Sequence, residues 1–496
     1  MTTYQYRFPY GLDLRHDAAD SDPRSVRIAT NLDLRANGKY FTRGALSKIC
    51  EVSAESVGLY SFNGALHAVV PGGQGLQDER PAEVVYDPIG PYVGLDEDGE
   101  PNEPEAYDLG TLARLRALEV IGSADVVGGF PYVVLEKSDG TFEHHWLTET
   151  VADADDPVET GVSLPFDPGP TLAKIEGKLT ADDPSNGVLR FNSTTGGPRD
   201  WSTVRDAGFL AVSQHAAGAR QITGQGIFNK RLAILFEDSI QIWNMAADPS
   251  NITLENTLTG PGTKLNASGA VENVLGDLIY SSQGGFRSLS VVDLAGQTRE
   301  GDIGSFIQTE TDDLDMDNNW VTGFWSQSRS QYICAVGSDV YVFTNAVISK
   351  TRGWTKWSLP VTIHYICEHA GDVYIRSGNV IYKLDATLEE DDVAGGTDIE
   401  WQLRTQFLDG KTPGVRKHWK FMNLVMTGAA QVNFYYDSRD TDELVITGPY
   451  LENTTYQAGL TPIMCMSEHL AVEFVGTGRW ELDAVNLTFD VLRGGV

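Results

Sequence analysis

Three aspartates in one short stretch have a spacing that could do chemistry. Asp313, Asp315 and Asp317 stand at alternate positions in "DDLDMDNNW", and alternating carboxylates are how a calcium loop presents oxygen ligands. Such a loop also needs Gly at its sixth position and Glu at its twelfth, where this chain has Asn318 and Phe324. The stretch therefore predicts either a solvated loop or a weak cation site.

Histidines occur in two close pairs, but their spacing does not suit a shared metal. His144 and His145 are adjacent, and His364 and His369 are five residues apart. In a regular strand, side chains at odd spacings point to opposite faces. We therefore interpret these histidines as structural, and the sequence singles out no cofactor-binding residue and no cofactor.

Motifs for catalysis are missing from the sequence. It contains no GxxxxGK[ST] phosphate loop, no GxSxG elbow and no HExxH. A glycoside hydrolase needs two carboxylates at a fixed separation, and with 69 Asp and Glu residues no pair stands out. We therefore expect no catalytic residue and a protein that is not an enzyme, with a propeller-type glycoside hydrolase as a remaining alternative.

The elements that would carry such residues are repeated β-hairpins. In "NKRLAILFEDSIQIWN" two runs of alternating apolar residues flank a polar break, which is the pattern of two strands and a tight turn. Similar hairpins begin at Lys230, Gly276, Gln331 and Gly371, at steps close to the ~40–50 residues of a four-stranded propeller blade. The hydrophobic residues of the quoted hairpin, Trp243 included, should then pack between blades.

These patterns predict an all-β protein with two main parts. We expect an N-terminal arm at 1–50, a β-propeller-like domain of about six blades at 51–395, and a C-terminal β-sandwich at 396–496. Acidic loop insertions are expected near 76–118 and 146–200, because their composition cannot bury enough apolar surface to order itself. A stack of sheets that does not close into a ring is the alternative to a propeller.

The charge balance argues against a nucleic-acid-binding protein. The chain carries 69 Asp and Glu against 37 Lys and Arg, a net charge of −32, and it lacks the clustered cations that grip phosphates. The excess of acid fits either solubility or a surface that DNA passes without sticking. The four dispersed cysteines predict no disulfide framework, and we expect neither a signal peptide nor membrane insertion.

Several stretches in a fixed order resemble one family of viral proteins. "RFNSTTGGPRDWS" is followed by "GFLAVSQHAAGARQITGQGIFNKRLAILFEDSIQIWN" and then by "LIYSSQGGFRSLS". Near the start, "NLDLRANGKYFTRGAL" contains Asn31, Gly38, Arg43 and Gly44, and "ELDAVNLTFDVLRGG" stands near the end. Together they resemble the tail nozzle, or tail tube, proteins of short-tailed bacteriophages.

The resemblance implies a virion structural protein assembled in the host bacterial cytoplasm. It implies a homohexameric ring below the adaptor, or head-to-tail connector, that carries tail fibres or spikes. Genomic DNA would be ejected through the ring as passing cargo. An alternative within the same class is another phage tail or baseplate protein that binds host surface glycans.

Overall fold

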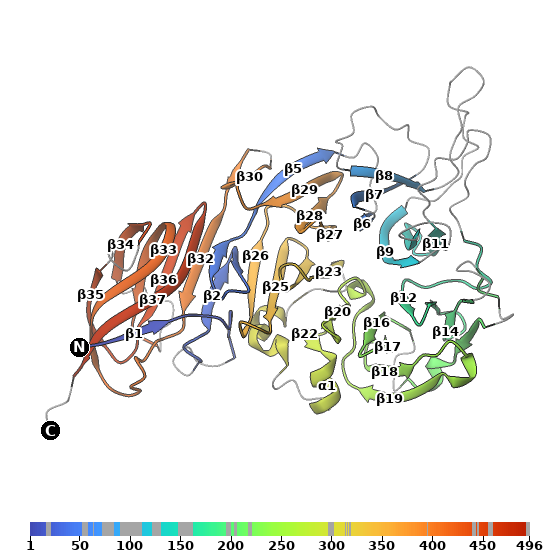
Figure 1. Ribbon diagram of the computed structural model, residues 1–496, viewed down its shortest axis with the longest axis horizontal. Coiled ribbons are helices and arrows are strands. Elements are labelled where there is room, and N and C mark those ends of the chain that lie inside the picture. Colours follow the sequence, from blue (N-terminus) through green and yellow to red (C-terminus); the bar gives the residue numbers. More distant parts are fainter. Residues whose placement is uncertain are drawn as a thin grey trace, which may run out of the picture.

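A computed structural model (Figure 1) gives the structure of the chain, and it is built almost wholly from β-strands. Sheets arranged around a centre form one end of the molecule, and a sandwich holding the last strands forms the other. The structure describes residues 1–15, 21–51, 58–62, 64–71, 84–89, 112–121, 130–146, 162–194, 200–202, 206–216, 221–295, 302–312, 314, 316, 319–393, 395–438, 443, 446–454 and 460–492.

The sheets at the first end form a closed ring. Each has one innermost strand, and in the described chain seven such strands contact one another in a complete circuit from β6 back to β6. They are β6 (Gly58–Phe62), β9 (Leu112–Ile121), β12 (Leu172–Ile175), β16 (Gly224–Phe228), β20 (Glu272–Val274), β23 (Val321–Ser326) and β27 (Tyr365–His369). Sheets closed around an axis are the architecture of a β-propeller, so the predicted fold class is confirmed.

The outer strands complete each blade in chain order. The first three blades add β7 (Ala65–Pro71) and β8 (Val84–Ile89), then β10 (Phe130–Lys137) and β11 (Phe142–Trp146), then β13 (Lys178–Asp183), β14 (Val188–Phe191) and β15 (Gly208–Leu210). The next three add β17 (Arg231–Leu235), β18 (Ser239–Asn244) and β19 (Thr253–Thr259), then β21 (Asp277–Ser282) and β22 (Gly285–Ser288), then β24 (Gln331–Val336), β25 (Asp339–Ala346) and β26 (Thr351–Ser358). Helices α1 (Leu289–Ala295) and α2 (Gln308–Thr311) lie between β22 and β23.

The ring has seven described blades, where we expected about six. The difference comes from 146–200, which we expected to be an insertion but which holds β12, β13 and β14. Buried charged residues give these strands an amino-acid composition that resembles that of a loop. Lys178 is fully buried, and its Nζ donates to the carbonyl oxygen of Asp206 at 2.7 Å and to its carboxylate at 3.0 Å.

The hairpin at 229–244 packs as its alternation predicts. One face of β17 and β18, with Leu232, Ile234 and Trp243, joins the core shared with β12, β14 and β15. The other face, with Ala233 and Ile242, joins the core shared with β21 and the start of α1. The Trp243 indole nitrogen donates to Gln241 at 3.0 Å, so this hairpin is packing material between two neighbouring blades.

The seventh blade is closed by a strand from near the N-terminus. It consists of β27, β28 (Asp372–Ser377), β29 (Val380–Asp385) and, on its outside, β5 (Ala45–Glu51), which pairs antiparallel with β29. Part of the segment that we expected to be an arm therefore locks the ring.

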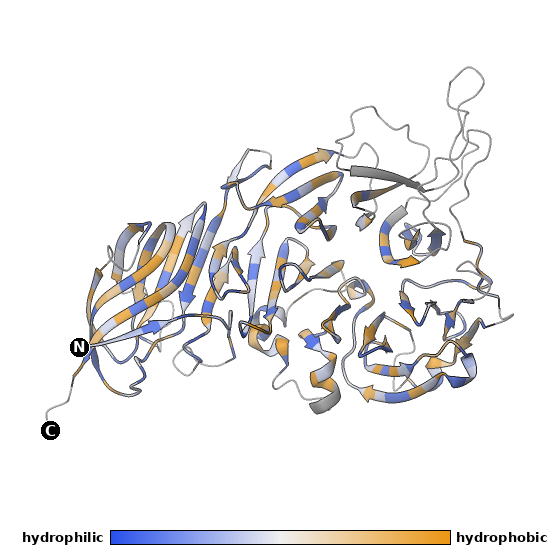
Figure 2. Cartoon of the chain, in the orientation of Figure 1, coloured by the Kyte–Doolittle hydropathy of each residue, from blue (hydrophilic) through white to orange (hydrophobic). Residues whose placement is uncertain are grey.

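The C-terminal residues form a sandwich around one long strand. β33 (Lys417–Tyr435) pairs in its first half with β35 (Leu460–Ser467) and β37 (Trp480–Val491), and in its second half with β34 (Ile446–Glu452) and β36 (Ala471–Thr477). Figure 2 shows hydrophobic and hydrophilic residues alternating along these strands. That alternation is the sequence pattern from which the sandwich was predicted.

The other N-terminal strands join the two parts, which an isolated arm could not do. β2 (Val26–Thr30) lies between blade strand β26 and sandwich strand β32 (Glu400–Thr405), so one 14-stranded sheet runs through both parts. β1 (Thr2–Tyr6) and β4 (Tyr40–Thr42) pair with β37, and β3 (Leu32–Leu34) pairs with β4.

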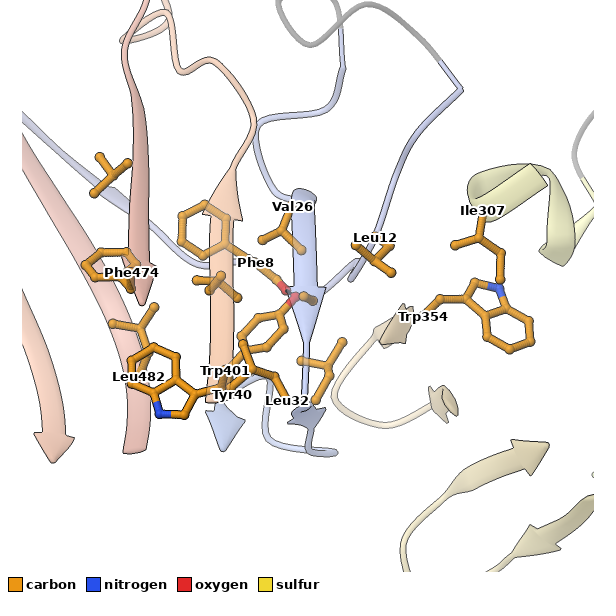
Figure 3. Packing of buried hydrophobic residues seen from close by; sticks show 14 of the residues in the cluster. Phe8, Leu12, Val26, Leu32, Tyr40, Ile307, Trp354, Trp401, Phe474 and Leu482 are labelled. Carbon is orange, nitrogen blue, oxygen red and sulfur yellow. Dashed lines mark hydrogen bonds between the residues drawn. The ribbon is translucent and has the colours of Figure 1, made fainter. Parts of the chain in front are cut away.

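A continuous core fills the junction between the ring and the sandwich (Figure 3). Val26, Leu32 and Tyr40 lie between Trp401 of the sandwich and Trp354 of the sixth blade, and all five belong to one buried cluster. The Tyr40 hydroxyl donates to the carbonyl oxygen of Phe8 at 3.1 Å.

Asn31 and Arg43 clamp the N-terminal segment in place. Asn31 Nδ2 donates to the carbonyl oxygen of Glu400 at 2.7 Å, while its Oδ1 accepts from the Ser358 amide at 2.8 Å and from Arg43 Nε at 3.1 Å. Arg43 in turn pairs through two nitrogens with Asp391, in the small hairpin β30 (Glu390–Asp391) and β31 (Thr397–Asp398). No helix in the described part of the chain is long and apolar enough to cross a membrane.

Candidate functional site in the central channel

A cavity of about 720 Å³ runs through the centre of the ring. Every one of the seven innermost strands contributes to its wall, because inner strands converge on the axis of a propeller. Its lining includes Tyr60, Arg116, Ala173, Gln225, Glu272, Phe324 and Cys367, one from each inner strand. This channel collects polar groups from distant parts of the chain.

Two carboxylates on different blades face the channel. Glu119 lies on β9 and accepts the Lys174 amide at 3.1 Å, while Glu272 begins β20. Burial raises the pKa of Glu119 to about 7. Burial, and then the negative charge of Glu119, raise the pKa of Glu272 to about 8. Near neutral pH the pair therefore holds at least one proton, and it can act as a hydrogen-bond donor as well as an acceptor.

A hydrogen-bonded chain beside the channel positions Gln225. Gln225 donates to Thr171 at 2.6 Å and accepts from Thr180 at 2.7 Å, and the Thr171 amide and hydroxyl both donate to Asp182. Burial raises the pKa of Asp182 to about 7, against the lowering effect of the Thr171 hydrogen bonds. The network ties the third blade to the fourth through polar groups.

A basic cluster lies at the end of the channel where the inner strands begin. The Arg116 and Arg114 guanidinium carbons stand 4.4 and 5.4 Å from the centre of the Trp320 ring. Burial, followed by the charges of Arg376 and Arg114, lowers the pKa of His364, which precedes β27. The three arginines and the neutral imidazole of His364 are therefore neighbours although they come from different blades.

The opposite end of the inner strands carries acidic and neutral polar groups. Glu368 accepts from the Ser328 hydroxyl at 2.6 Å, and Ser61 and His369 share a hydrogen bond of 2.9 Å. Glu368 therefore places a carboxylate at the end of the channel opposite the arginine cluster.

Of the residues singled out from the sequence, the structure places His364 and His369 at the two ends of the channel. Asp313, Asp315 and Asp317, the candidate cation ligands, lie outside the described residues. His144 and His145 are both buried in the second blade, and the His144 Nδ1 shares a hydrogen bond of 3.0 Å with the Tyr132 hydroxyl.

The channel residues left a trace in the sequence that motif reasoning passed over. "LARLRALEVI" is the sequence of β9, where Arg114, Arg116 and Glu119 interrupt an apolar run. "AVENVL" likewise places Glu272 inside the segment that we expected to be an inner strand. Charged residues within inner strands of a ring are the signal for a polar channel.

Comparisons with known proteins give loose structural likenesses. No family model matches the chain, and no curated protein matches it. Among solved structures, the WD40 domain of Toxoplasma gondii coronin is 10% identical, with a TM-score of 0.38 over 72% of this chain and 87% of that one. BamB from Moraxella catarrhalis is 10% identical, with a TM-score of 0.33 over 78% of this chain and 96% of that one. The Pan2 WD40 domain of Neurospora crassa is 6% identical, with a TM-score of 0.32 over 57% of this chain and 91% of that one.

Proposed function

We propose that the chain is a structural subunit of a bacteriophage tail. In this proposal, copies of the chain form an oligomeric nozzle or tube, a homohexamer, below the adaptor. Genomic DNA leaves through the tube, and tail fibres or spikes attach to its outside. The order of motifs from residue 31 to the final strands motivates the proposal.

The observation that carries the proposal is the single sheet shared by the ring and the sandwich. Because β2 pairs with both β26 and β32, the two parts cannot hinge freely about a linker. A protein that must hold its shape within a conduit requires this stiffness, whereas an enzyme with a closing lid requires motion between its parts.

The charge of the chain supports the same proposal. A net charge of −32 disfavours retention of DNA, because phosphates gain no counterion release at an acidic wall. DNA would thus be passing cargo and not a ligand.

The oligomeric state of the purified chain tests the proposal. Light scattering after size exclusion, with electron microscopy of the same fractions, should show rings with an open centre, either alone or on the adaptor of the same phage. A particle that remains a monomer at high concentration and in the presence of that adaptor would overturn the proposal.

A second candidate, a glycoside hydrolase, is favoured by the glutamate pair. Glycoside hydrolases use one protonated and one ionised carboxyl group, and Glu119 and Glu272 have the raised pKa values that such a division requires. Release of sugar from a panel of chromogenic glycosides, abolished by either Glu119→Gln or Glu272→Gln, would support it. Activity that survives both substitutions would exclude this pair as the catalytic groups.

A further inference from the structure

At the basic end of the central channel, two arginines share one paired carboxylate among the described residues. Arg114 and Arg116 stand beside Trp320, with Arg376 and the neutral imidazole of His364 close by. The carboxylate that pairs there with Arg114 and Arg116 is Glu136, and a single oxygen of it, Oε2, serves both. This local positive excess stands out in a chain with a net charge of −32.

Arg116 is held in a position where its hydrogen-bonding capacity is only partly used. The residue is 4% exposed, and its Nη2 donates to the carbonyl oxygen of Leu265 at 3.2 Å. Its Nε and Nη1 have no hydrogen-bond partner, and Glu136 Oε2 stands 3.6 Å from Nη1, beyond a good hydrogen bond. A buried cation with unused donors is costly unless an anion reaches it.

Of the two arginines that face Glu136, Arg114 is the more exposed. Its side chain is 35% exposed, and its Nε lies 3.2 Å from Glu136 Oε2. His364 is exposed beside it, and Arg376 lies on the neighbouring strand β28 with its carbonyl oxygen accepting the His364 amide at 2.9 Å. A ligand that enters from solvent therefore meets Arg114 and His364 first and Arg116 behind them.

We propose that this end of the channel binds carboxylate side chains of an acidic peptide segment presented by a partner protein. A guanidinium matches a carboxylate through two parallel hydrogen bonds. One peptide carboxylate would accept from the Arg116 nitrogens that Glu136 does not satisfy. The aromatic ring of Trp320 and the apolar channel wall at Phe324 and Tyr365 can pack against the rest of the peptide. The site goes beyond the proposed structural function and does not depend on it.

A nucleic-acid backbone fits the same cations less well. A polyanion would approach a strongly acidic molecule over a long stretch, and the repulsion grows with every phosphate. A short peptide presents few charges and mixes them with apolar side chains, so it gains contacts without that penalty.

Fluorescence anisotropy with a labelled hexapeptide in which glutamate and leucine alternate tests the proposal in the full-length chain. We expect saturable binding to the unmodified protein that weakens at least tenfold in Arg114→Gln. Arg231→Gln is the matched control, because Arg231 is similarly exposed, at 31%, and is paired with Glu255 at 2.6 Å on another blade. That variant should bind as tightly as the unmodified protein.

The outcomes separate the alternatives. Equal binding of a control hexapeptide in which glutamine replaces each glutamate, or equal loss in the two variants, would overturn the carboxylate site. Inorganic phosphate that displaces the peptide at equal or lower concentration than acetate would assign the cluster to phosphate instead. Circular dichroism should give the same spectrum for Arg114→Gln as for the unmodified chain. An unfolded Arg114→Gln would be replaced by Arg114→Lys, which keeps the charge but loses the paired hydrogen bonds of a guanidinium, and which we expect to weaken binding as well.

Discussion

At the scale of single residues, the channel gathers groups that other parts of the chain keep separate. Glu119 and Glu272 stand 153 positions apart in the sequence, yet the charge of one raises the pKa of the other. Nothing local marks either residue as part of a pair. The pairing depends on ring closure, which no motif encodes, so sequence reasoning found many carboxylates and could not choose among them.

The raised pKa of Glu272 makes stability depend on pH. A carboxyl group with a pKa of about 8 in the folded chain and about 4.3 in the unfolded one binds its proton more tightly when folded. Its contribution is therefore fully present below pH ~4, and it is lost as the pH rises to about 8. Between pH 6 and pH 8.5, Glu272→Gln should lose less stability to denaturant than the unmodified protein does, and the part of the loss that remains comes from Glu119 and Asp182, whose pKa values are about 7.

The expected difference between those two proteins is on the order of 2 kcal/mol. This difference is smaller than the free energy that corresponds to the full pKa shift of Glu272, because the side chain still borders the channel. Glu255→Gln, on the outside of the fourth blade, is the control and should leave the pH dependence unchanged. Parallel pH curves for Glu272→Gln and the unmodified protein would contradict the assignment.

At the scale of elements, alternation of apolar residues was enough to find most of the ring. The segments that contain β16, β20, β23 and β27 were all expected as inner strands from their sequence alone. The third blade was missed because β13 carries Lys178, Asp182 and Asp183, which read as loop residues. Each is buried with a partner, Asp183 with Arg190 Nε at 2.8 Å for example, and the pattern of residue types does not show which partner a charged residue will meet.

The pair of Arg43 and Asp391 fastens two elements that the sequence placed in different regions. Both side chains are almost fully buried, and Asp391 also accepts the Leu46 amide at 2.7 Å. Asp391→Asn leaves the Arg43 charge buried without its counter-ion, so we expect a loss of about 3–5 kcal/mol in the free energy of unfolding.

Chemical denaturation measures that loss, and an exposed ion pair supplies its control. Glu51→Gln removes the partner of Lys48 near the end of the same strand β5, and should change the midpoint little because solvent screens the pair. Equal midpoints for Asp391→Asn and Glu51→Gln would show that the buried pair does not hold β5 in place.

At the scale of the whole molecule, the sequence predicted two parts but not how they are joined. The change in strand length near residue 396 separated a sandwich from the ring, and the sandwich is present. The arm expected at 1–50 instead supplies β1 to β5, which pair with both parts. Short strands that find partners more than 300 residues away carry no local sign of those partners.

The shared sheet predicts that the molecule unfolds as one unit. Scanning calorimetry should give a single transition, with near-ultraviolet circular dichroism and intrinsic fluorescence changing together. Thr30→Pro, in β2 at its contact with Lys356, should lower that transition because proline removes a donor and disfavours an interior strand. Two separated transitions in the unmodified protein would contradict the joined architecture.

The strand that closes the seventh blade is synthesised long before the strand with which it pairs. β5 leaves the ribosome early, but its partner β29 begins at Val380, more than 300 residues later. At roughly 5–20 residues per second, the edge that β5 will cover does not exist until on the order of half a minute afterwards. During that interval β5 is an unpaired strand beside incomplete sheets. Correct folding of this protein therefore depends on keeping this early strand from pairing with the wrong sheet edge.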